Sequence, residues 1–511
     1  MKSVETAASA ILGWALKRRL ARLDDVRTRP HELQEQLLHY LVHTARHTAW
    51  GRDYGYAEGL TATEFARRVP VSSYEELYPR IEQVLHGEAD VLWPGRVEWF
   101  AKSSGTTNAR SKYIPVTAEA LEDGHYRAGR DMVALANTLY PDAGVLRGKT
   151  LALGGSHAPN PFRPDDPDSH VGDVSAVIMH NLPRWAQNRR TPPLELALLD
   201  EWEEKLERMA QHVLHENVVT LAGVPTWMIL LLRRVSELAG GVPITEVWPN
   251  LRLFLHGAVA FGPYREVFRQ LIPAEHMRYL EIYNASEGYL AFQDQPDCPD
   301  LLLLLDHGIY YEFIPADELD REQPRTLTLA EVEVGPSYAI IISTNAGLWR
   351  YRIGDTVRFT SVMPYRIRIS GRTKHFLNAF GEEVVVENAE AAVAAAAEAT
   401  GALVRDFTAA PIYFEAGAGS RGGHQWLIEF AQPPADAAQF AAVLDTTLRQ
   451  LNSDYDAKRH RNLALQPPVL TVVEPGTFSG WLARRGKLGG QHKVPRLSNS
   501  RELVDELLAP A

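Results

Sequence analysis

The chain has 511 residues, more than one hydrophobic core usually organises, so we expect two or more domains. Its 45% apolar and 23% charged residues are typical of a globular protein, and its net charge of −11 argues against a general basic surface for nucleic acid or an anionic membrane. The single cysteine, Cys298, excludes an intramolecular disulfide and cysteine-rich metal sites and fits a reducing compartment. The apolar runs are too short to span a bilayer and the N-terminus lacks a signal-peptide pattern, so we expect the cytoplasm.

In the first half of the chain, the spacing of apolar residues predicts helices, followed by an alternation of strands and helices. Residues 1–50 carry Leu and Ala at helical spacing. A helix is expected to begin at Thr117, a suitable N-cap, without a capping box because Ala120 stands three residues later. Strand-like and helical segments then alternate, at 150–155, 198–214, 218–224, 227–240 and 251–259. This alternation favours an α/β sheet with many parallel strands.

The second half predicts a β-rich part and then a smaller unit. Consecutive strands are expected at 301–315, 325–335 and 337–362. After residue 370 the pattern becomes helix, strand, strand and helix, at 386–401, 405–415, 424–432 and 436–452. Helix propensity on a surface would be enough to explain the Ala-rich first helix. We therefore predict an α/β fold in two domains, a large one over 1–370 and a small α+β domain over 371–511.

A short hydroxylated run is the first candidate binding loop. It is five residues long and reads Ser103-Ser104-Gly105-Thr106-Thr107, with Lys112 close behind. Backbone N–H groups, hydroxyl donors and a glycine that permits close approach suit a polyphosphate. The run lacks the Gly-Lys-Ser/Thr ending of a Walker loop, which disfavours a P-loop of the kinase or GTPase type. Taken alone, it is equally an ordinary polar turn.

The second candidate follows the strand-like segment MRYLEI and reads Tyr283-Asn284-Ala285-Ser286-Glu287-Gly288. Ligands of α/β sheets usually bind where strands end. Ser286 can donate to a phosphate, and Glu287 supplies the hard oxygen that Mg²⁺ prefers. The alternative is a strand-to-turn connection with an exposed glutamate.

Three later motifs supply further charged groups. Asp355 in YRIGD is expected at a turn between strands, where its carboxylate can accept both ribose hydroxyls or serve the turn itself. Arg372 in SGRTK stands where the pattern changes, at a possible interdomain hinge or in an exposed basic turn. The Gly-rich run 487–496 presents Lys493, which suits a mobile cation for developing negative charge or a solvated loop.

Together and in this order, these motifs resemble those of the adenylate-forming superfamily, which includes acyl-CoA synthetases, luciferases and peptide-synthetase adenylation domains. The closer resemblance is to the Gretchen Hagen family of acyl-acid amido synthetases. It rests on four stretches and covers nearly the whole chain; the stretches read SSGTTNARSKYIP, YNASEGY, WRYRIGDTVRF and GQHKVPRLS. Ala109 departs from the pattern, in which glycine is common, and the first fifty residues match loosely.

The resemblance implies a large adenylate-forming domain, a small mobile C-terminal domain, and a role for each motif. Glu287 would ligate Mg²⁺, and Lys493 would approach the α-phosphate and the carboxylate during adenylation. Asp355 would bind the ribose with help from Arg372, and the segment of Gly257 and Ala258 would line the adenine. The remaining residues implied at the ATP or AMP site are Ser103, Ser104, Gly105, Thr106, Thr107, Tyr283, Asn284, Ala285 and Ser286.

The implied activity is an ATP-dependent ligase reaction in two half-reactions. A carboxylic acid and ATP give acyl-AMP and pyrophosphate, and an amine, expected to be that of an amino acid, then attacks to form an amide. Mg²⁺ is the expected cofactor. Two alternatives stay open: a thioester-forming ligase with the same adenylation chemistry, and a nucleotide-binding sensor that kept the fold without catalysis. The retained Glu287 and Lys493 count against the sensor.

Overall fold

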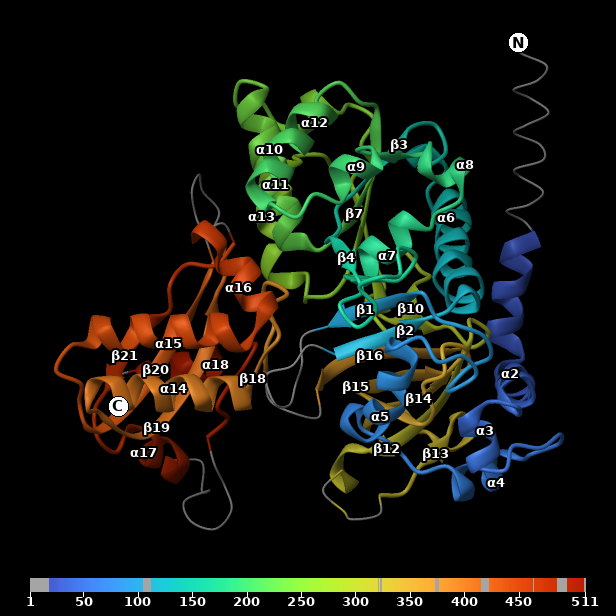
Figure 1. Cartoon of the computed structure of the whole chain (residues 1–511). Coiled ribbons are helices and arrows are strands. Elements are labelled where there is room, and N and C mark those ends of the chain that lie inside the picture. Colours follow the sequence, from blue (N-terminus) through green and yellow to red (C-terminus); the bar gives the residue numbers. More distant parts are fainter. Residues whose placement is uncertain are drawn as a thin grey trace.

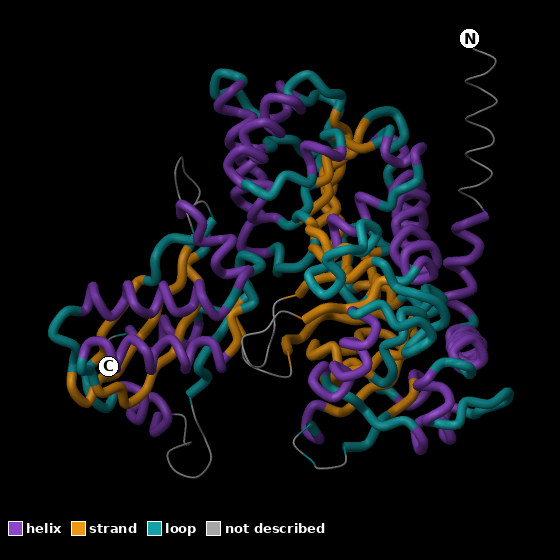
Figure 2. Tube along the Cα trace, in the orientation of Figure 1, coloured by secondary structure: helices purple, strands orange, loops and turns teal. Residues whose placement is uncertain are grey.

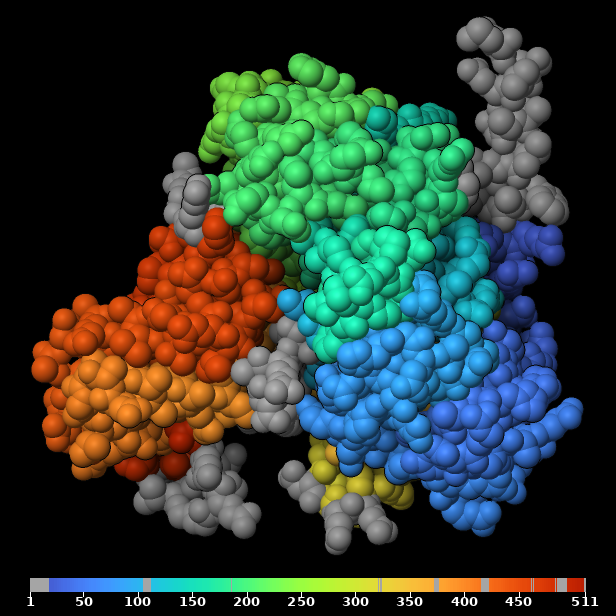
Figure 3. Space-filling model, viewed as in Figure 1, coloured from blue at the N-terminus to red at the C-terminus, as the bar shows by residue number. Residues whose placement is uncertain are grey.

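The computed structural model describes residues 18–103, 112–319, 321, 324–372, 376–414, 422–462, 464–484 and 494–509. The chain forms a large part built on one long mixed sheet and, from residue 376 onward, a smaller part with its own sheets, seen to one side in Figures 1 and 3. Helices and strands are distributed through both parts (Figure 2). The predicted α/β class with a β-rich portion is confirmed, whereas the mobility of the smaller part and the boundary at residue 370 stay predictions. Among the described helices, none is both long and apolar enough to cross a membrane.

The N-terminal segment is helical, as its periodicity predicts. Residues 18–28 form a helix. The helices that follow are α2 (Pro30–Ala45), α3 (Ala49–Asp53), α4 (Ala62–Arg68) and α5 (Tyr74–Leu85). Thr61 and Ser73 begin α4 and α5 with complete capping boxes, which satisfy backbone donors that the first helical turn leaves open.

One half of the long sheet is parallel. Its strands lie in the order β9-β8-β7-β3-β6, and neighbours run parallel throughout. The strands are β3 (Lys149–Ala152), β6 (Arg190–Thr191), β7 (Val218–Gly223), β8 (Leu253–His256) and β9 (Arg278–Ala285). The connecting helices are α7 (Val174–His180), α8 (Arg184–Gln187), α9 (Leu194–Ala197), α10 (Trp202–Val213), α11 (Pro225–Leu238), α12 (Ile244–Val247) and α13 (Arg265–Leu271). The alternation read from the sequence is therefore correct.

Both faces of this parallel half are buried. Successive side chains of a strand point to opposite faces, so two neighbouring residues show what covers each face. Leu253 belongs to the core that includes α6 (Arg127–Leu139), whereas Phe254 belongs to the core that includes α10 and α11. Figure 1 shows α10 and α11 on one side of β7 and α6 on the other. Helices on both faces leave the strand ends as the place where a ligand can reach the sheet.

The other half of the sheet is antiparallel and continues from β9 in the order β10-β11-β16-β15-β14-β12-β13. The strands are β10 (Gly288–Gln293), β11 (Leu301–Leu303), β12 (Ile309–Pro315), β13 (Leu327–Thr328), β14 (Ser337–Thr344), β15 (Tyr351–Val362) and β16 (Tyr365–Arg372). The strand expected over 325–335 is shorter than predicted, since a 3₁₀ turn follows β13 at Leu329–Glu331.

The expected turn at Asp355 is wrong. The strand β15 runs through this residue without interruption, and Asp355 pairs with Arg372 of β16. Gly354 takes a φ of 95°, a left-handed value that glycine accepts without steric cost, close to a register shift between β14 and β15. The glycine thus bends the strand locally where the sequence suggests that the chain turns back.

A smaller four-stranded sheet has two strands before and two strands after the helix expected from Thr117. Its order is β2-β1-β5-β4, formed by β1 (Trp99–Ser103), β2 (Lys112–Val116), β4 (His157–Pro159) and β5 (His170–Gly172). Thr117 caps the next helix as expected, because its Oγ1 accepts from the N–H of Ala120 at 3.0 Å. The sequence did not indicate that the first turns, η1 (Ala120–Tyr126), form a π-helix before α6 begins.

The smaller part contains the helices and strands predicted after residue 370. Its sheets are the pair β17 (Phe376–Leu377) and β18 (Val384–Val385), and the order β19-β20-β21 from β19 (Leu403–Ile412), β20 (Gly423–Gln432) and β21 (Val469–Val473). Its helices are α14 (Val386–Thr400), α15 (Ala437–Leu451), α16 (Ser453–Arg459), α17 (Thr477–Arg484) and α18 (Glu502–Leu508). The Ala-rich helix α14 is not merely a surface helix, because Ala389, Ala392 and Ala396 are buried, and small side chains allow close packing there.

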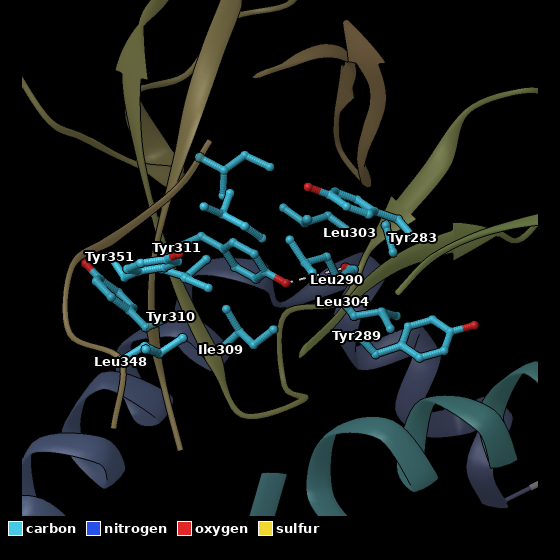
Figure 4. Close-up of a cluster of buried hydrophobic side chains, with 14 of the residues drawn as sticks. Tyr283, Tyr289, Leu290, Leu303, Leu304, Ile309, Tyr310, Tyr311, Leu348 and Tyr351 are labelled. Atoms are coloured by element: carbon cyan, nitrogen blue, oxygen red, sulfur yellow. Dashed lines mark hydrogen bonds between the residues drawn. The ribbon is translucent and has the colours of Figure 1, made fainter. Parts of the chain in front are cut away.

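A buried ion pair anchors the start of β15. The Arg350 guanidinium donates to both carboxylate oxygens of Glu312 at 2.8 Å, and it also donates to the carbonyls of Ala66 and Val69 at 2.7 Å. This planar, bidentate geometry suits Arg, and the extra bonds satisfy its remaining donors. Figure 4 shows the packed core beside it, where the Tyr311 hydroxyl donates to the Leu290 carbonyl. The strand that carries Asp355 is therefore held rigidly at its beginning.

Candidate active site

A cavity of about 630 Å³ lies where the parallel and antiparallel halves of the long sheet meet. One side consists of strand ends and connections of the large part, and we call it the sheet wall: Ser103, Lys112, Ala258, Tyr283, Asn284, Ala285, Ser286, Glu287 and Asp355. The other side comes from residues after β16, and we call it the C-terminal wall: Phe376, Asn378, Ala379, Glu383, Tyr413 and Asn499. A cavity of this size at the carboxyl ends of parallel strands accommodates a small-molecule ligand.

Two candidate residues of the sheet wall bind each other directly. The Tyr283 hydroxyl donates to the Asp355 carboxylate at 2.5 Å, and both side chains are buried. Strand β9 supplies the tyrosine and β15 supplies the aspartate, 72 residues later. The bond fixes the direction of one carboxylate oxygen, so Asp355 presents a defined acceptor to the cavity.

The neighbouring Asn284 side chain points the other way. Its Oδ1 lies 2.9 Å from Nδ1 of His125, which the π-helical turn η1 supplies. Burial lowers the pKa of His125 to about 4, so its imidazole is neutral near pH 7. Asn284 lines the cavity, whereas His125 stands behind it, because the cavity wall includes only the asparagine.

A cation, a carboxylate and a phenol gather at the end of β1. Lys112, at the start of β2, places Nζ 3.5 Å from the Tyr351 hydroxyl and 5.6 Å from the ring centre of Tyr74. Burial first, and the nearby Glu287 carboxylate second, hold the pKa of Tyr351 well above its ordinary value. Tyr351 therefore keeps its proton, and Lys112 and Glu287 bring opposite charges to the cavity beside Ser103.

The segment after β8 approaches the cavity with a constrained backbone. A Cβ on Gly257 would lie 2.4 Å from the carbonyl oxygen of Ile282, so only glycine fits there. Ala258, which lines the cavity, has a φ of 70°, unusual for a residue with a side chain. His256 faces the apolar core instead, stacked 4.0 Å from the ring centre of Phe261, and burial lowers its pKa to about 3.

The C-terminal wall is organised by a buried carboxylate. Glu382 accepts from the backbone N–H groups of Ala379 at 3.1 Å and Phe380 at 2.6 Å, and from Nε2 of His424 at 2.8 Å. These bonds shape the turn that brings Glu383 to the cavity with a φ of 42°. Asn378 joins the two walls, because its Nδ2 donates to the Ala258 carbonyl at 3.3 Å.

Most of the predicted residues that the structure describes line this one cavity. Gly257 stands directly behind its wall, and Arg372 pairs through its backbone with Asp355, without a described side chain. Five candidates lie outside the described residues, namely Ser104, Gly105, Thr106, Thr107 and Lys493. Lys112, singled out from the sequence as the cation close behind the hydroxylated loop but given no contact of its own, also lines the cavity. Sequence reasoning missed His125, which no local pattern marks.

Family models match the chain over three consecutive stretches. The N-terminal domain of the GH3 family matches residues 19–277, its central domain residues 302–372, and its C-terminal domain residues 387–502. The chain belongs to the GH3 family. This is the Gretchen Hagen family that the four motifs resemble, so the recognition made from the sequence is confirmed.

Curated relatives are similar over most of their length. The indole-3-acetic acid-amido synthetase GH3.3 of Arabidopsis thaliana is 23% identical, with 93% of this chain and 90% of the relative covered. The jasmonoyl–L-amino acid synthetase JAR4 of Nicotiana attenuata is 23% identical, covering 64% of this chain and 66% of the relative. The first alignment extends across all three matched stretches.

Solved structures share the fold. The AtGH3.15 acyl acid amido synthetase in complex with 2,4-DB aligns with a TM-score of 0.62 at 18% identity, covering 96% of this chain and 95% of that one. A 2-hydroxyisobutyryl-CoA ligase in complex with 2-HIB-AMP and CoA aligns with a TM-score of 0.55 at 14% identity, covering 95% and 93%. The chain thus shares the fold of these enzymes over nearly its whole length.

Proposed function

We propose that this GH3-family protein is an ATP-dependent acyl-acid amido synthetase. In the first half-reaction a carboxylate oxygen attacks the α-phosphorus of ATP, the bond to the β-phosphate breaks, and acyl-AMP and pyrophosphate form. In the second, the amine of an amino acid attacks the acyl carbonyl, AMP leaves, and the amide forms with release of a proton. One observation carries the proposal: the cavity brings together Ser103, the 283–287 segment and Asp355 from separate parts of the sequence.

The sheet wall supports the nucleotide half of this proposal. Asp355, oriented by Tyr283, would accept the ribose hydroxyls, and Ser286 would donate to the α-phosphate. Gly257 allows the backbone to come close, and Ala258 would border the adenine. Lys112 adds a cation to the hydroxyl-rich loop that begins at Ser103. Positive charge is needed there because attack of a carboxylate on a phosphate brings two anions together.

Mg²⁺ fits the same place. Such an ion usually takes one or two carboxylates, with substrate phosphates and water as its other ligands, and Glu287 supplies a carboxylate at the cavity wall. The described residues contain no cluster of three or more metal-binding side chains, and a nucleotide-bound Mg²⁺ does not need one. When bound, the ion would neutralise phosphate charge during displacement. Lys493 would add a further cation for adenylation.

The C-terminal wall is consistent with the second requirement of the proposed reaction, a site that excludes water. Acyl-AMP is a mixed anhydride that water hydrolyses, so a wall that covers the cavity protects it. We propose that the residues from 371 onward form the covering domain and that the segment around Arg372 acts as its hinge. The cytoplasm, where ATP is available, is the proposed location, in keeping with the single cysteine.

Pyrophosphate release with a panel of acids tests the first half-reaction. The panel would contain indole-3-acetate, jasmonate, benzoate and short fatty acids, each with ATP and Mg²⁺. Mass spectrometry with the twenty amino acids, or with CoA in their place, then identifies the product. An amide supports the proposal, a thioester in its place contradicts it, and the absence of pyrophosphate with every acid would favour a non-catalytic sensor.

A further inference from the structure

The π-helical turn η1 places a buried histidine behind the cavity. Thr117 anchors the turn at its start, where its Oγ1 donates to the Asn345 carbonyl at 2.8 Å and accepts from the N–H of Ala120. Within η1, His125 is 4% exposed and meets Asn284 across 159 residues of sequence. A π-turn inserts an extra residue into a helix and is frequently found at functional sites. Here its effect is to bring the imidazole to the side chain of Asn284.

This contact determines what Asn284 offers to a ligand. The neutral imidazole carries one proton, and Asn284 directs Oδ1 at its Nδ1, so Nδ1–H donates to that oxygen. The two N–H groups of Asn284 Nδ2 are then left for the cavity that this residue lines. The opposite arrangement would turn an oxygen toward the anionic reactants. The histidine therefore selects a donor over an acceptor at this point of the wall.

The direction of Asn284 favours a role beside the second reactant, in place of the ATP-site role that the family resemblance implies for it. Adjacent residues of a strand point to opposite sides, and Tyr283 reaches Asp355 while Asn284 reaches His125. The Asp355 side would take the ribose, so the Asn284 side is left for the other reactant. Ser286, which would hold the α-phosphate, stands two residues further on in the same wall of the cavity.

We propose that His125 is a positioning residue that fixes Asn284, whose Nδ2–H then donates a hydrogen bond to a carboxylate oxygen of the acyl substrate. The same oxygen is the carbonyl oxygen of the acyl-adenylate, and it gains negative charge when the amine attacks. A fixed donor therefore serves both half-reactions, first by orienting the carboxylate and then by stabilising the oxyanion. This inference rests on the proposed function.

Three single variants and one double variant test it. Asn284→Ala removes the donor, and we expect kcat/KM for the acid to fall by about 10- to 100-fold, the effect of one hydrogen bond to a charged group. Asn284→Asp still accepts from His125 but presents an oxygen to the acid, so it should be worse than Asn284→Ala. His125→Phe should resemble Asn284→Ala, and the double variant His125→Phe/Asn284→Ala should be no worse than Asn284→Ala alone.

The KM for ATP distinguishes a loss of acid positioning by Asn284 from a general disturbance of the active site. It should stay within about threefold of wild type in all these variants, because Asn284 faces away from Tyr283 and Asp355. A rise in the KM for ATP with an unchanged KM for the acid would overturn the inference, as would Asn284→Asp with wild-type activity. Additive losses in the double variant would also contradict it. If the wild type releases no pyrophosphate with any acid, the proposed function fails as well. An active wild type with unaffected variants refutes the roles of His125 and Asn284 and leaves the proposed function standing.

Discussion

The two walls of the cavity are built in different ways. Most of the sheet wall belongs to the long sheet and its connections, where strand pairs such as Tyr283 with Asp355 fix the polar groups, and the smaller four-stranded sheet adds Ser103 and Lys112. The C-terminal wall belongs to other sheets, and its shape depends on a turn arranged around the single carboxylate of Glu382. Side-chain bonds such as that of Asn378 to the Ala258 carbonyl join the two.

We propose that groups that meet ATP with fixed geometry lie on the sheet wall, and that groups that admit the second substrate lie on the C-terminal wall. The C-terminal part packs on the large part through a shared apolar core as well as through hydrogen bonds, so its movement would cost both kinds of contact. We therefore expect sheet-wall substitutions to impair adenylation and C-terminal-wall substitutions to impair closure or transfer.

The largest effect is expected from Glu287→Gln on the sheet wall. Loss of the carboxylate removes the expected Mg²⁺ ligand, and the rate of pyrophosphate release should fall by about 100- to 1000-fold. Isotope exchange between pyrophosphate and ATP at several Mg²⁺ concentrations measures it. Glu281→Gln, which changes another carboxylate of the same cavity, is the matched control and should lose far less. A Glu287→Gln enzyme within threefold of wild type would remove this residue from the metal site.

Lys493→Ala should slow adenylation by about 100-fold, because the lysine would neutralise charge that develops only in that step. Lys493 lies outside the described residues, so its role rests on the sequence alone. ATP binding, followed by calorimetry, should remain detectable, and amide formation from synthetic acyl-AMP should be nearly normal. Adenylation at the wild-type rate would refute the assigned role.

Asp355→Asn should raise the KM for ATP by about tenfold, since a neutral amide replaces the carboxylate that would accept the ribose hydroxyls. Tyr283→Phe removes only the bond that orients Asp355 and should cost less. Initial rates with ATP and with 2′-deoxy-ATP measure both. If Asp355 contacts the ribose, the variant should discriminate less between the two nucleotides; unchanged discrimination would place the ribose elsewhere.

On the C-terminal wall, Glu382→Gln should lower the free energy of unfolding by about 1–3 kcal/mol, because a buried network of two backbone donors and His424 loses its charged acceptor. Chemical denaturation measures the change, and Glu398→Gln, at an exposed position of α14, is the control. Transfer from synthetic acyl-AMP should suffer more than ATP binding does. An equal loss in both would contradict the distinction between the two walls.

The smallest effect is expected on the pH dependence of stability, through the buried His256 behind the sheet wall. Burial lowers the pKa of His256 to about 3, so the unfolded chain takes up a proton near the ordinary value of 6.5, before the folded protein does. This residue therefore lowers stability as pH falls from 6.5 toward 3. His256→Phe should make the loss between pH 7 and pH 5 smaller by about 1–2 kcal/mol. The exposed His215 is the control, and an unchanged pH dependence would contradict the burial of a neutral imidazole.

Local patterns in the sequence were sufficient to predict most helices and strands and to recognise the family. Alternating apolar segments predicted β3, α10, β7, α11 and β8, because the periodicity of burial is a local property. The four motifs identified the family for a similar reason: each is a short stretch whose residue types suit one part of a nucleotide. The roles inferred for their residues are still predictions.

Local sequence patterns failed where contacts with distant parts of the chain determine the structure of a segment. Asp355 was expected at a turn, but pairing with β14 and β16 keeps the strand continuous and a left-handed Gly354 absorbs the bend. The Ala-rich α14 was explained by propensity, but its alanines are buried. In both cases the deciding contact comes from another part of the chain.

Only the tertiary structure placed His125 behind Asn284, turned Tyr283 toward Asp355 and brought Lys112 close to Tyr351. These pairs join residues 72 to 239 positions apart in the sequence. Their formation depends on strand register and on the path of a π-helical turn, which arise from the packing of the whole sheet and its helices. The residue types that can serve the chemistry are thus visible in the sequence, whereas their directions follow from the fold.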